Sequence, residues 1–179
     1  TGVASYLGAN LNSLSIGVTG GNASATNYTL PTSGSLDITS RAVTLAASAQ
    51  NTTYGSSLDL GLTAYTVSTG SVASGDAISS VTLQFNGNVT VPATTNAATY
   101  ANGIVASSAF GTGGFNTTNY AITYAPANLI VNQKAITLTA NAQSTTYGTA
   151  LTLGTNAYTL TSGNLANSDV ISGVTLQFN

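Results

Sequence analysis

The chain carries few side chains that could do acid–base or nucleophilic chemistry. It has no His and no Cys, and its charged residues are two basic and four acidic ones, so general-base and thiol chemistry lack their usual side chains. Glycoside hydrolysis would need two carboxylates that converge on one bond. Asp76 and Asp169, however, occupy equivalent positions of a repeated sequence and are expected to lie one repeat apart. We therefore expect no catalytic residue, no cofactor and no enzymatic activity.

The acidic residues do not form a known metal-binding pattern either. The sequence has no Asp-x-Asp-x-Asp-Gly loop, and hard cations prefer several clustered oxygen ligands. Asp37 or Asp59 could contribute to a calcium site at a domain junction, but Asp59 becomes Thr152 in the repeated sequence. The sequence therefore predicts no metal site that recurs along the chain.

Charge and composition restrict the partners and the location. Two separated basic residues, Arg41 and Lys134, cannot neutralise a nucleic-acid backbone, so no nucleic-acid partner is expected. No run of 18 apolar residues occurs, so no membrane span is expected. The chain is 42% hydrophobic and can bury a core, while its polar residues are mostly Thr, Ser, Asn and Gly. Together with the absence of Cys, this composition favours an extracellular protein, either secreted or held at the cell surface.

The sequence repeats itself. Residues 41–86 and 134–179 align without a gap at an offset of 93 residues, and 27 of the 46 paired positions are identical. Both copies contain Thr-Thr-Tyr-Gly, and both end with Val-Thr-Leu-Gln-Phe-Asn. A repeat of this length is the size of a small domain, so the sequence predicts tandem domains of about 93 residues each.

The expected fold class is mostly β, because apolar residues alternate with Thr or Ser at a period of two. Each unit is expected to be a small sheet-rich domain, and a β-grasp-like arrangement with one short helical turn is one form it could take. We expect strands near residues 42–47, 81–85, 88–91, 120–124 and 129–131. The side chains expected in the core are Val43, Leu45, Val81, Leu83, Phe85, Tyr120, Ile122 and Val131.

Short motifs predict the turns. Asn86 and Gly87 both tolerate positive φ and lie between two strand patterns, which predicts a two-residue hairpin. Tyr54–Gly55 and Tyr147–Gly148 are expected to mark an equivalent turn in each copy, with the tyrosines packed at the edge of the core. In residues 74–79 and 167–172 an Asp precedes a short apolar pair, as a helix cap would, so a single helical turn is expected there.

The ends of the copies predict the domain boundaries. Residues 1–39 are expected to be the C-terminal part of one unit, residues 40–132 a complete unit, and residues 133–179 the N-terminal part of a third. Only two residues separate the last strand of a unit from the first strand of the next, so the junctions are expected to be stiff. Neither terminal part can bury a full core alone. We therefore expect Leu176 and Phe178 to be covered by a neighbouring segment, either of the same polypeptide or of another chain.

These motifs resemble a known family. The Thr-rich first strand, the Thr-Tyr-Gly turn, residues 70–76, the Asn-Tyr-Ala-Ile that ends at Ile122, and residues 129–131 resemble the MBG-type (YDG/YGX-type) repeats. Such repeats occur in long tandem arrays of large bacterial surface adhesins and exported filamentous proteins. The resemblance covers the complete unit and both partial ones, although members of that family usually carry more charge. It implies a stalk or adhesive array and supplies no catalytic residue.

The expected function is structural: a repeat segment of an extracellular bacterial fibre or adhesin stalk that extends or polymerises through end-to-end β domains. Its partners would be neighbouring repeat units or identical chains. The alternative is a module that binds glycans or another surface, for which Tyr54, Tyr65, Tyr147 and Tyr158 would provide a sugar-stacking stripe. Packing in or beside the core is the competing role of these tyrosines.

Overall fold

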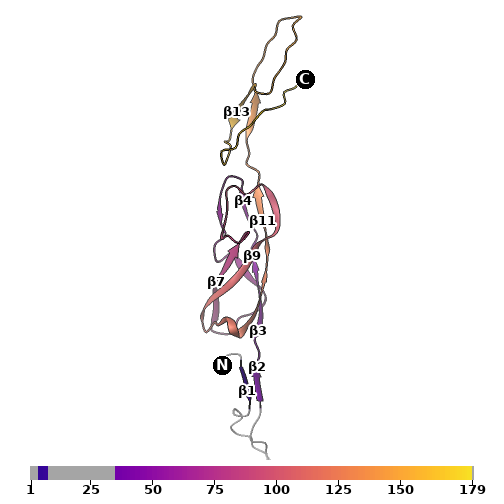
Figure 1. Cartoon of the computed structure of the whole chain (residues 1–179). Helices are drawn as coiled ribbons and strands as arrows, with labels where there is room; N and C mark the ends of the chain where they lie inside the picture. The colour runs from indigo at the N-terminus through magenta and orange to yellow at the C-terminus, as the bar shows by residue number, and fades with distance from the viewer. Residues whose placement is uncertain (1–3, 8–34, 179) are drawn as a thin grey trace, which may run out of the picture.

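The computed structural model describes residues 4–7 and 35–178, and it is mostly β and elongated (Figure 1). Groups of paired strands follow one another along the long axis, with β1 (Ala4–Leu7) and β2 (Ser35–Ile38) at one end. The broad central part begins at β3 (Arg41–Ala47) and ends at β11 (Ala127–Asn132). The last two strands, β12 (Thr137–Ala140) and β13 (Tyr158–Ser162), lie at the other end. The mostly β fold class is therefore confirmed.

The central part contains three small sheets. The remaining strands are β4 (Gln50–Thr53), β5 (Leu58–Asp59), β6 (Tyr65–Gly70), β7 (Asp76–Gln84), β8 (Thr90–Val91), β9 (Ala98–Gly113) and β10 (Tyr120–Ala125). Strand order is β10-β3-β6 in one sheet, β4-β11-β9-β7 in the second and β5-β8 in the third. β10 runs parallel to β3 and β11 runs parallel to β4, while the other pairs are antiparallel. The first and last thirds of residues 41–132 are thus held together by parallel pairing.

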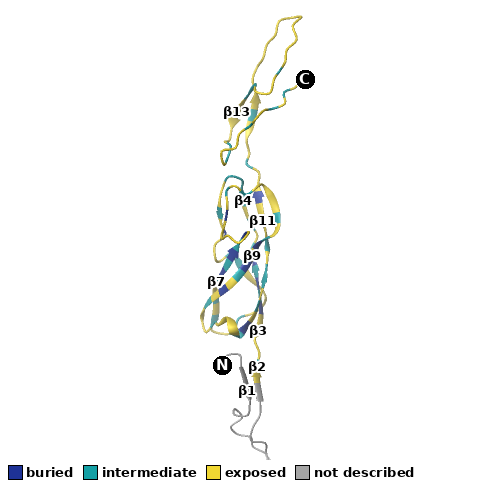
Figure 2. Ribbon diagram, in the orientation of Figure 1, coloured by how far each residue is buried: buried dark blue, intermediate teal, exposed yellow. Residues whose placement is uncertain are grey.

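One hydrophobic core lies between these sheets (Figure 2). Alternation along β3 buries Val43 and Leu45, and alternation along β7 buries Val81 and Leu83. The expected core is confirmed except at Ile122, which is half-buried and packs against the buried cluster. Leu60, Val91, Ile104, Ala106, Ala109 and Leu129 complete that cluster together with Ala47.

The expected turn at Asn86 and Gly87 is present, but the hairpin is much shorter than expected. Both residues have positive φ, 48° and 80°, and the backbones of Phe85 and Asn88 exchange two hydrogen bonds across the turn. The pairing ends at this one bridge, because β8 leaves to pair with β5 and β7 pairs with β9 instead. The expectation that residues 81–85 and 88–91 form an extended hairpin is therefore wrong.

The expected helical turns are also absent. Residues 74 and 75 form a turn, the amide of Asp76 donates to the carbonyl of Ala73, and Asp76 then begins β7. Residues 167 and 168 form a turn at the equivalent place in the second copy, but both have positive φ, whereas in the first copy only Gly75 does. Pairing with β9 provides β7 with ladder hydrogen bonds from Asp76 to Gln84, interrupted by two register shifts, and a single helical turn could not match them. The one helical segment in residues 4–7 and 35–178 is a 3-10 turn at Thr117–Asn119, and no helix there is long and apolar enough to cross a membrane.

The two copies of the repeated sequence share hydrogen bonds at the same offset of 93 residues. β12 pairs with β13 in the register that β3 uses with β6, including the irregularity, which lies between Thr44 and Leu45 and between their equivalents Thr137 and Leu138. The Gln50 side chain donates to the carbonyl of Leu60, and Gln143 donates to that of Leu153. The Tyr65 hydroxyl donates to the Ile78 carbonyl, and Tyr158 donates to that of Ile171. At these positions equivalent residues adopt equivalent local structure, although residues 134–178, the described part of the second copy, have no strands equivalent to β4, β5 and β7, and only the first copy is covered by β9, β10 and β11.

Short connections join the parts of the chain. Thr39 and Ser40 separate β2 from β3, and residues 133–136 separate β11 from β12. Such spans leave little length for a flexible tether. The rigidity of these junctions stays a prediction, and a contact that bears on it is described below.

The Tyr120 hydroxyl connects three elements of the central part. It donates to the Asp76 carboxylate at the start of β7 and accepts from the amide of Ala73. Its ring is buried and stacks on Phe115, with ring centroids 5.0 Å apart. Burial raises the pKa of Tyr120 above 10.0, and the hydrogen bond to Asp76 raises this pKa further.

Replacing Tyr120 by Phe is expected to lower the free energy of unfolding by about 1–3 kcal/mol, since the Ala73 amide and the Asp76 carboxylate lose a partner. Wild-type stability should be at its full value below pH 10 and should fall above it, because the unfolded tyrosine ionises at a lower pH than the folded one. Denaturant titrations from pH 7 to pH 11 measure both effects.

The Phe variant should lose less stability than the wild type above pH 10. Some dependence should remain, because burial also raises the pKa of Tyr65. An unchanged alkaline slope in the variant would contradict the role given to Tyr120.

Candidate functional site

The candidate site lies where the central part of the structure meets the second copy of the repeated sequence. On the first side, Tyr54 and Gly55 form a turn directly after β4. The amide of Tyr54 donates to the carbonyl of Asn132 at 2.9 Å, which extends the pairing of β4 with β11. The amide of Gly55 donates to the carbonyl of Ala93 at 3.0 Å, and Gly55 has a φ of +88°. The turn is therefore fixed to the end of the central core.

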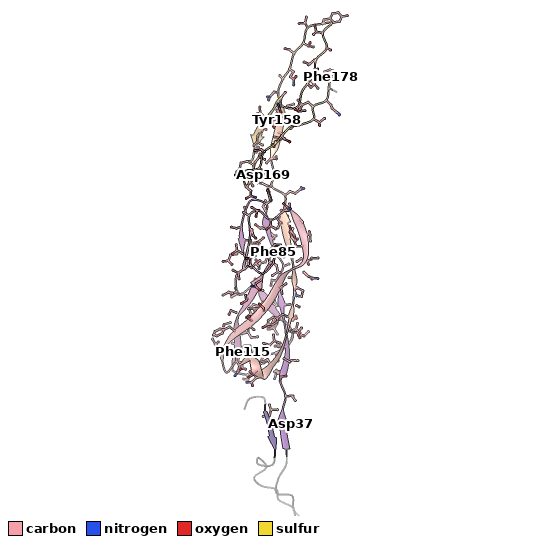
Figure 3. All side chains as sticks on the ribbon, in the orientation of Figure 1. Asp37, Phe85, Phe115, Tyr158, Asp169 and Phe178 are labelled. Atoms are coloured by element: carbon pink, nitrogen blue, oxygen red, sulfur yellow. The ribbon has the colours of Figure 1, made fainter. Side chains whose placement is uncertain are left out.

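On the second side, a turn of residues 166–169 faces this one. Asn167 and Ser168 both have positive φ, 52° and 64°, and the amide of Asp169 donates to the carbonyl of Ala166 at 2.7 Å. Asn tolerates this region of φ better than most residues, which accounts for Asn167 but not for Ser168. The turn presents the Asp169 carboxylate beside the central part (Figure 3).

Two side-chain hydrogen bonds join the turns. The Tyr54 hydroxyl donates to the Asp169 carboxylate at 2.8 Å, between residues 115 positions apart in the sequence. The Asn167 side chain donates to the carbonyl of Ala93 at 3.0 Å. A Cβ atom on Gly55 would lie 2.5 Å from the Cβ of Ala166. The two turns are therefore so close that only glycine fits at position 55 without a shift. Hydrogen bonds and close packing thus act at the same contact.

A cavity of about 430 Å³ lies beside this contact, and its lining is mixed. Tyr54, Ile136 and Leu165 contribute apolar surface, while Lys134 and Asp169 contribute opposite charges; the other lining residues are Asn96, Ala97, Gln133, Asn164 and Ala166. None of these side chains is a thiol, an imidazole or a second carboxylate. The arrangement can hold two parts of a chain together, through the Tyr54–Asp169 hydrogen bond and the apolar surface beside it.

The comparisons with known proteins find nothing similar. No family model, no curated protein and no solved structure matches this chain. The resemblance to MBG-type repeats therefore stays a prediction, and the function has to be inferred from the residues themselves.

The structure places the expected turn residues in two different environments. Tyr54 and Gly55 are half-buried at the junction, and Tyr54 packs against the core as well. Their equivalents Tyr147 and Gly148 lie in the open, with Tyr147 fully exposed and nothing within 4 Å of a Cβ on Gly148. The same four-residue motif is thus in contact with a neighbour once and exposed once.

The residues expected to be covered by a neighbouring segment lie on an open face of the second copy. Phe178 is 95% exposed, whereas its equivalent Phe85 is 4% exposed and meets Tyr100 edge to face. Leu176 is half-buried, whereas its equivalent Leu83 is fully buried. Leu176 and Phe178 share an open cavity of about 370 Å³ with Leu151 and Leu153, among others. What covers this face stays a prediction.

The tyrosine stripe considered for the glycan-binding alternative does not form a continuous surface. Tyr65 and Tyr158 are half-buried, and their hydroxyls bond to backbone carbonyls of their own copies. The hydroxyl of Tyr54 bonds to Asp169, which leaves Tyr147 as the fully exposed member. Sequence reasoning missed the Tyr54–Asp169 pair and Asn167. A signal existed, because the Tyr and the Asp are both identical in the two copies.

Proposed function

We propose that the chain is a structural repeat segment of an extracellular bacterial fibre or adhesin stalk, built from tandem β domains of about 93 residues joined end to end. The proposal includes the boundaries at residues 1–39, 40–132 and 133–179. A β-grasp-like arrangement of each unit stays a prediction.

The observation that carries this proposal is the repetition at an offset of 93 residues. Identical residues at that offset make the same local hydrogen bonds in both copies, for example from Gln50 and Gln143. Repeats that each contact mainly their neighbours are the usual construction of extended proteins. Each added unit lengthens such a protein and uses the same interface between neighbouring units.

The surface and the junction support the same function. Two basic and four acidic residues in 179 leave a surface of neutral hydroxyl and amide groups. The contact of Tyr54 with Asp169 joins one unit to the next without a linker. A catalytic or glycan-binding protein would instead concentrate aromatic and polar groups in one concave site.

The mechanical part of the proposal predicts how length grows with repeat number. Because residues 86 and 179 are equivalent, residues 87–179 can be added after Asn179, once or repeatedly, to continue the repeat in register. The maximum dimension in small-angle X-ray scattering should rise by a constant increment with each addition. A flexible chain of domains would instead grow roughly as the square root of repeat number, and that result would contradict the proposal.

The location is tested separately. An antibody against the chain should label intact cells of the organism that produces it, at a distance from the envelope in electron micrographs. Labelling only after cells are broken open would contradict an extracellular role. Binding of the chain to a glycan array, lost on replacing Tyr147 by Ala, would favour the alternative of a surface-binding module.

A further inference from the structure

We propose that the Tyr-Gly turn and the Asp-containing turn form a recurring lock between successive units, and that the partner of each exposed half of the lock is another copy of the same repeat. The proposal rests on the tandem organisation proposed above and names the contact that sets the angle between units. In this chain the lock is closed once, by Tyr54 and Gly55 against residues 166–169.

The exposed half at one end of the chain is the turn at Tyr147 and Gly148. It repeats the closed turn in detail: the φ of Gly148 is +86° against +88° for Gly55, and Thr145 bonds to Thr149 as Thr52 bonds to Ser56. The Tyr147 side chain is fully exposed. An aromatic side chain held in open water by an ordered turn is in position to donate to a carboxylate of a following unit.

The other half of the lock is also present in the complete unit. Residues 73–76 form a turn at the place equivalent to residues 166–169, with the same amide-to-carbonyl bond from Asp76 to Ala73. The turns differ in that only Gly75 has positive φ here and Ser74 stands in place of Asn167, so the hydrogen bond that can recur is the one to the Asp. The Asp76 carboxylate already accepts from Tyr120 of its own unit, yet a carboxylate has about four lone-pair positions. It can therefore accept a second hydroxyl, from the Tyr-Gly turn of a preceding copy.

Sharing one carboxylate between two tyrosines gives the lock a structural consequence. Tyr120 packs in the core, so the Asp is held in place by its own unit before the neighbour arrives. Asp169 lies in a copy that lacks the strands carrying an equivalent of Tyr120, and there Tyr54 is its hydroxyl partner. The hydrogen bond across the junction therefore depends on a neighbouring turn that already holds its Asp in position.

The chain offers matched variants to test the lock. Tyr54→Phe and Gly55→Ala change the closed half, while Tyr147→Phe and Gly148→Ala make the same changes in the exposed half. Both glycines have nearly the same φ, so backbone strain cancels in the comparison, and the difference reports contact with Ala166. Because the chain contains no Cys, cysteines at the exposed positions Thr123 and Thr152 would carry spin labels on either side of the junction.

Distances between the labels should be narrowly distributed in the wild type. Loss of the hydrogen bond in Tyr54→Phe or Asp169→Asn should lower the ratio of docked to undocked conformations by roughly two- to tenfold. The double variant should lower it no further than either single one. Gly55→Ala should shift the mean distance, and the two variants of the exposed half should leave the distances unchanged.

A distribution in Tyr54→Phe, Asp169→Asn and Gly55→Ala identical to that of the wild type would overturn the lock. Broadening of equal size in Tyr147→Phe and Gly148→Ala would overturn it too, because it would show a general loss of order. In a chain lengthened by residues 87–179, Tyr147→Phe should broaden the distances across the second junction. The lock can fail while surface labelling of cells succeeds, and the reverse, so the two proposals are tested independently.

Discussion

Replacing Phe85 by Ala is expected to lower the free energy of unfolding by about 3–5 kcal/mol, whereas the same change at Phe178 should lower it by less than about 0.5 kcal/mol. The two residues are equivalent in the repeated sequence. Phe85 is 4% exposed and packs on Tyr100, while Phe178 is 95% exposed. Removing the Phe85 ring leaves a cavity among buried side chains, whereas removing the Phe178 ring changes only surface that is already in contact with water. Denaturant unfolding of both variants measures the difference.

The variants Phe85→Ala and Phe178→Ala also test whether added strands bury the open face of the second copy. When residues 87–179 are added after Asn179, the chain supplies equivalents of β9, β10 and β11 to residues 134–179. Phe178→Ala should then cost as much as Phe85→Ala. A large cost of Phe178→Ala in the chain as it stands would instead mean that another molecule already covers that face, and concentration-dependent stability would identify this case. Equal small costs at both positions would contradict the core described here.

Elements with regular alternation could be predicted from the sequence. Val43 and Leu45 in β3, and Val81 and Leu83 in β7, alternate with polar residues and are buried as expected. The longest strand, β9, was not predicted. Its sequence is rich in Ala, Ser and Gly, and the positive φ of Asn102 and Ser108 interrupts the period of two. A register shift against β11 accompanies Asn102, and one against β7 accompanies Ser108.

Strand partners and the contact between the turns could not be predicted, because they depend on residues that are far apart in the sequence. The Asn86 and Gly87 turn is set by local preferences for positive φ, and it was predicted. The strands on either side of this turn pair with distant segments: β8 pairs with β5, and β7 pairs with β9. These pairings bury Val91 and Leu83. The Tyr54–Asp169 contact joins residues 115 positions apart, and no spacing rule connects them. Its two residues were visible in the sequence only as identities between the copies.

Replacing Gly70 by Ala is expected to lower the free energy of unfolding by about 2–5 kcal/mol, and the same change at Gly61 by about 1–2 kcal/mol. Both glycines have positive φ, +74° and +69°, so the cost of the left-handed conformation is the same for both. They differ in space: a Cβ on Gly70 would lie 2.4 Å from the carbonyl oxygen of Ala42, while a Cβ on Gly61 would have nothing within 4 Å.

The additional cost at Gly70 follows from the place of its neighbour in the sheet. Gly70 pairs with Val43, and β3 is the central strand of its sheet, between β10 and β6. Movement of Ala42 away from a new methyl group would disturb the ladder on both edges of β3 and displace the buried Val43. Gly163 is the equivalent of Gly70, and a Cβ there would lie 2.6 Å from the carbonyl oxygen of Ala135. However, β12 belongs to a two-stranded sheet that can shift without disturbing a core, so Gly163→Ala should cost less than Gly70→Ala. Equal costs for the Gly70 and Gly61 variants in denaturant unfolding would show that conformation alone, and not the close approach to β3, requires glycine at this position.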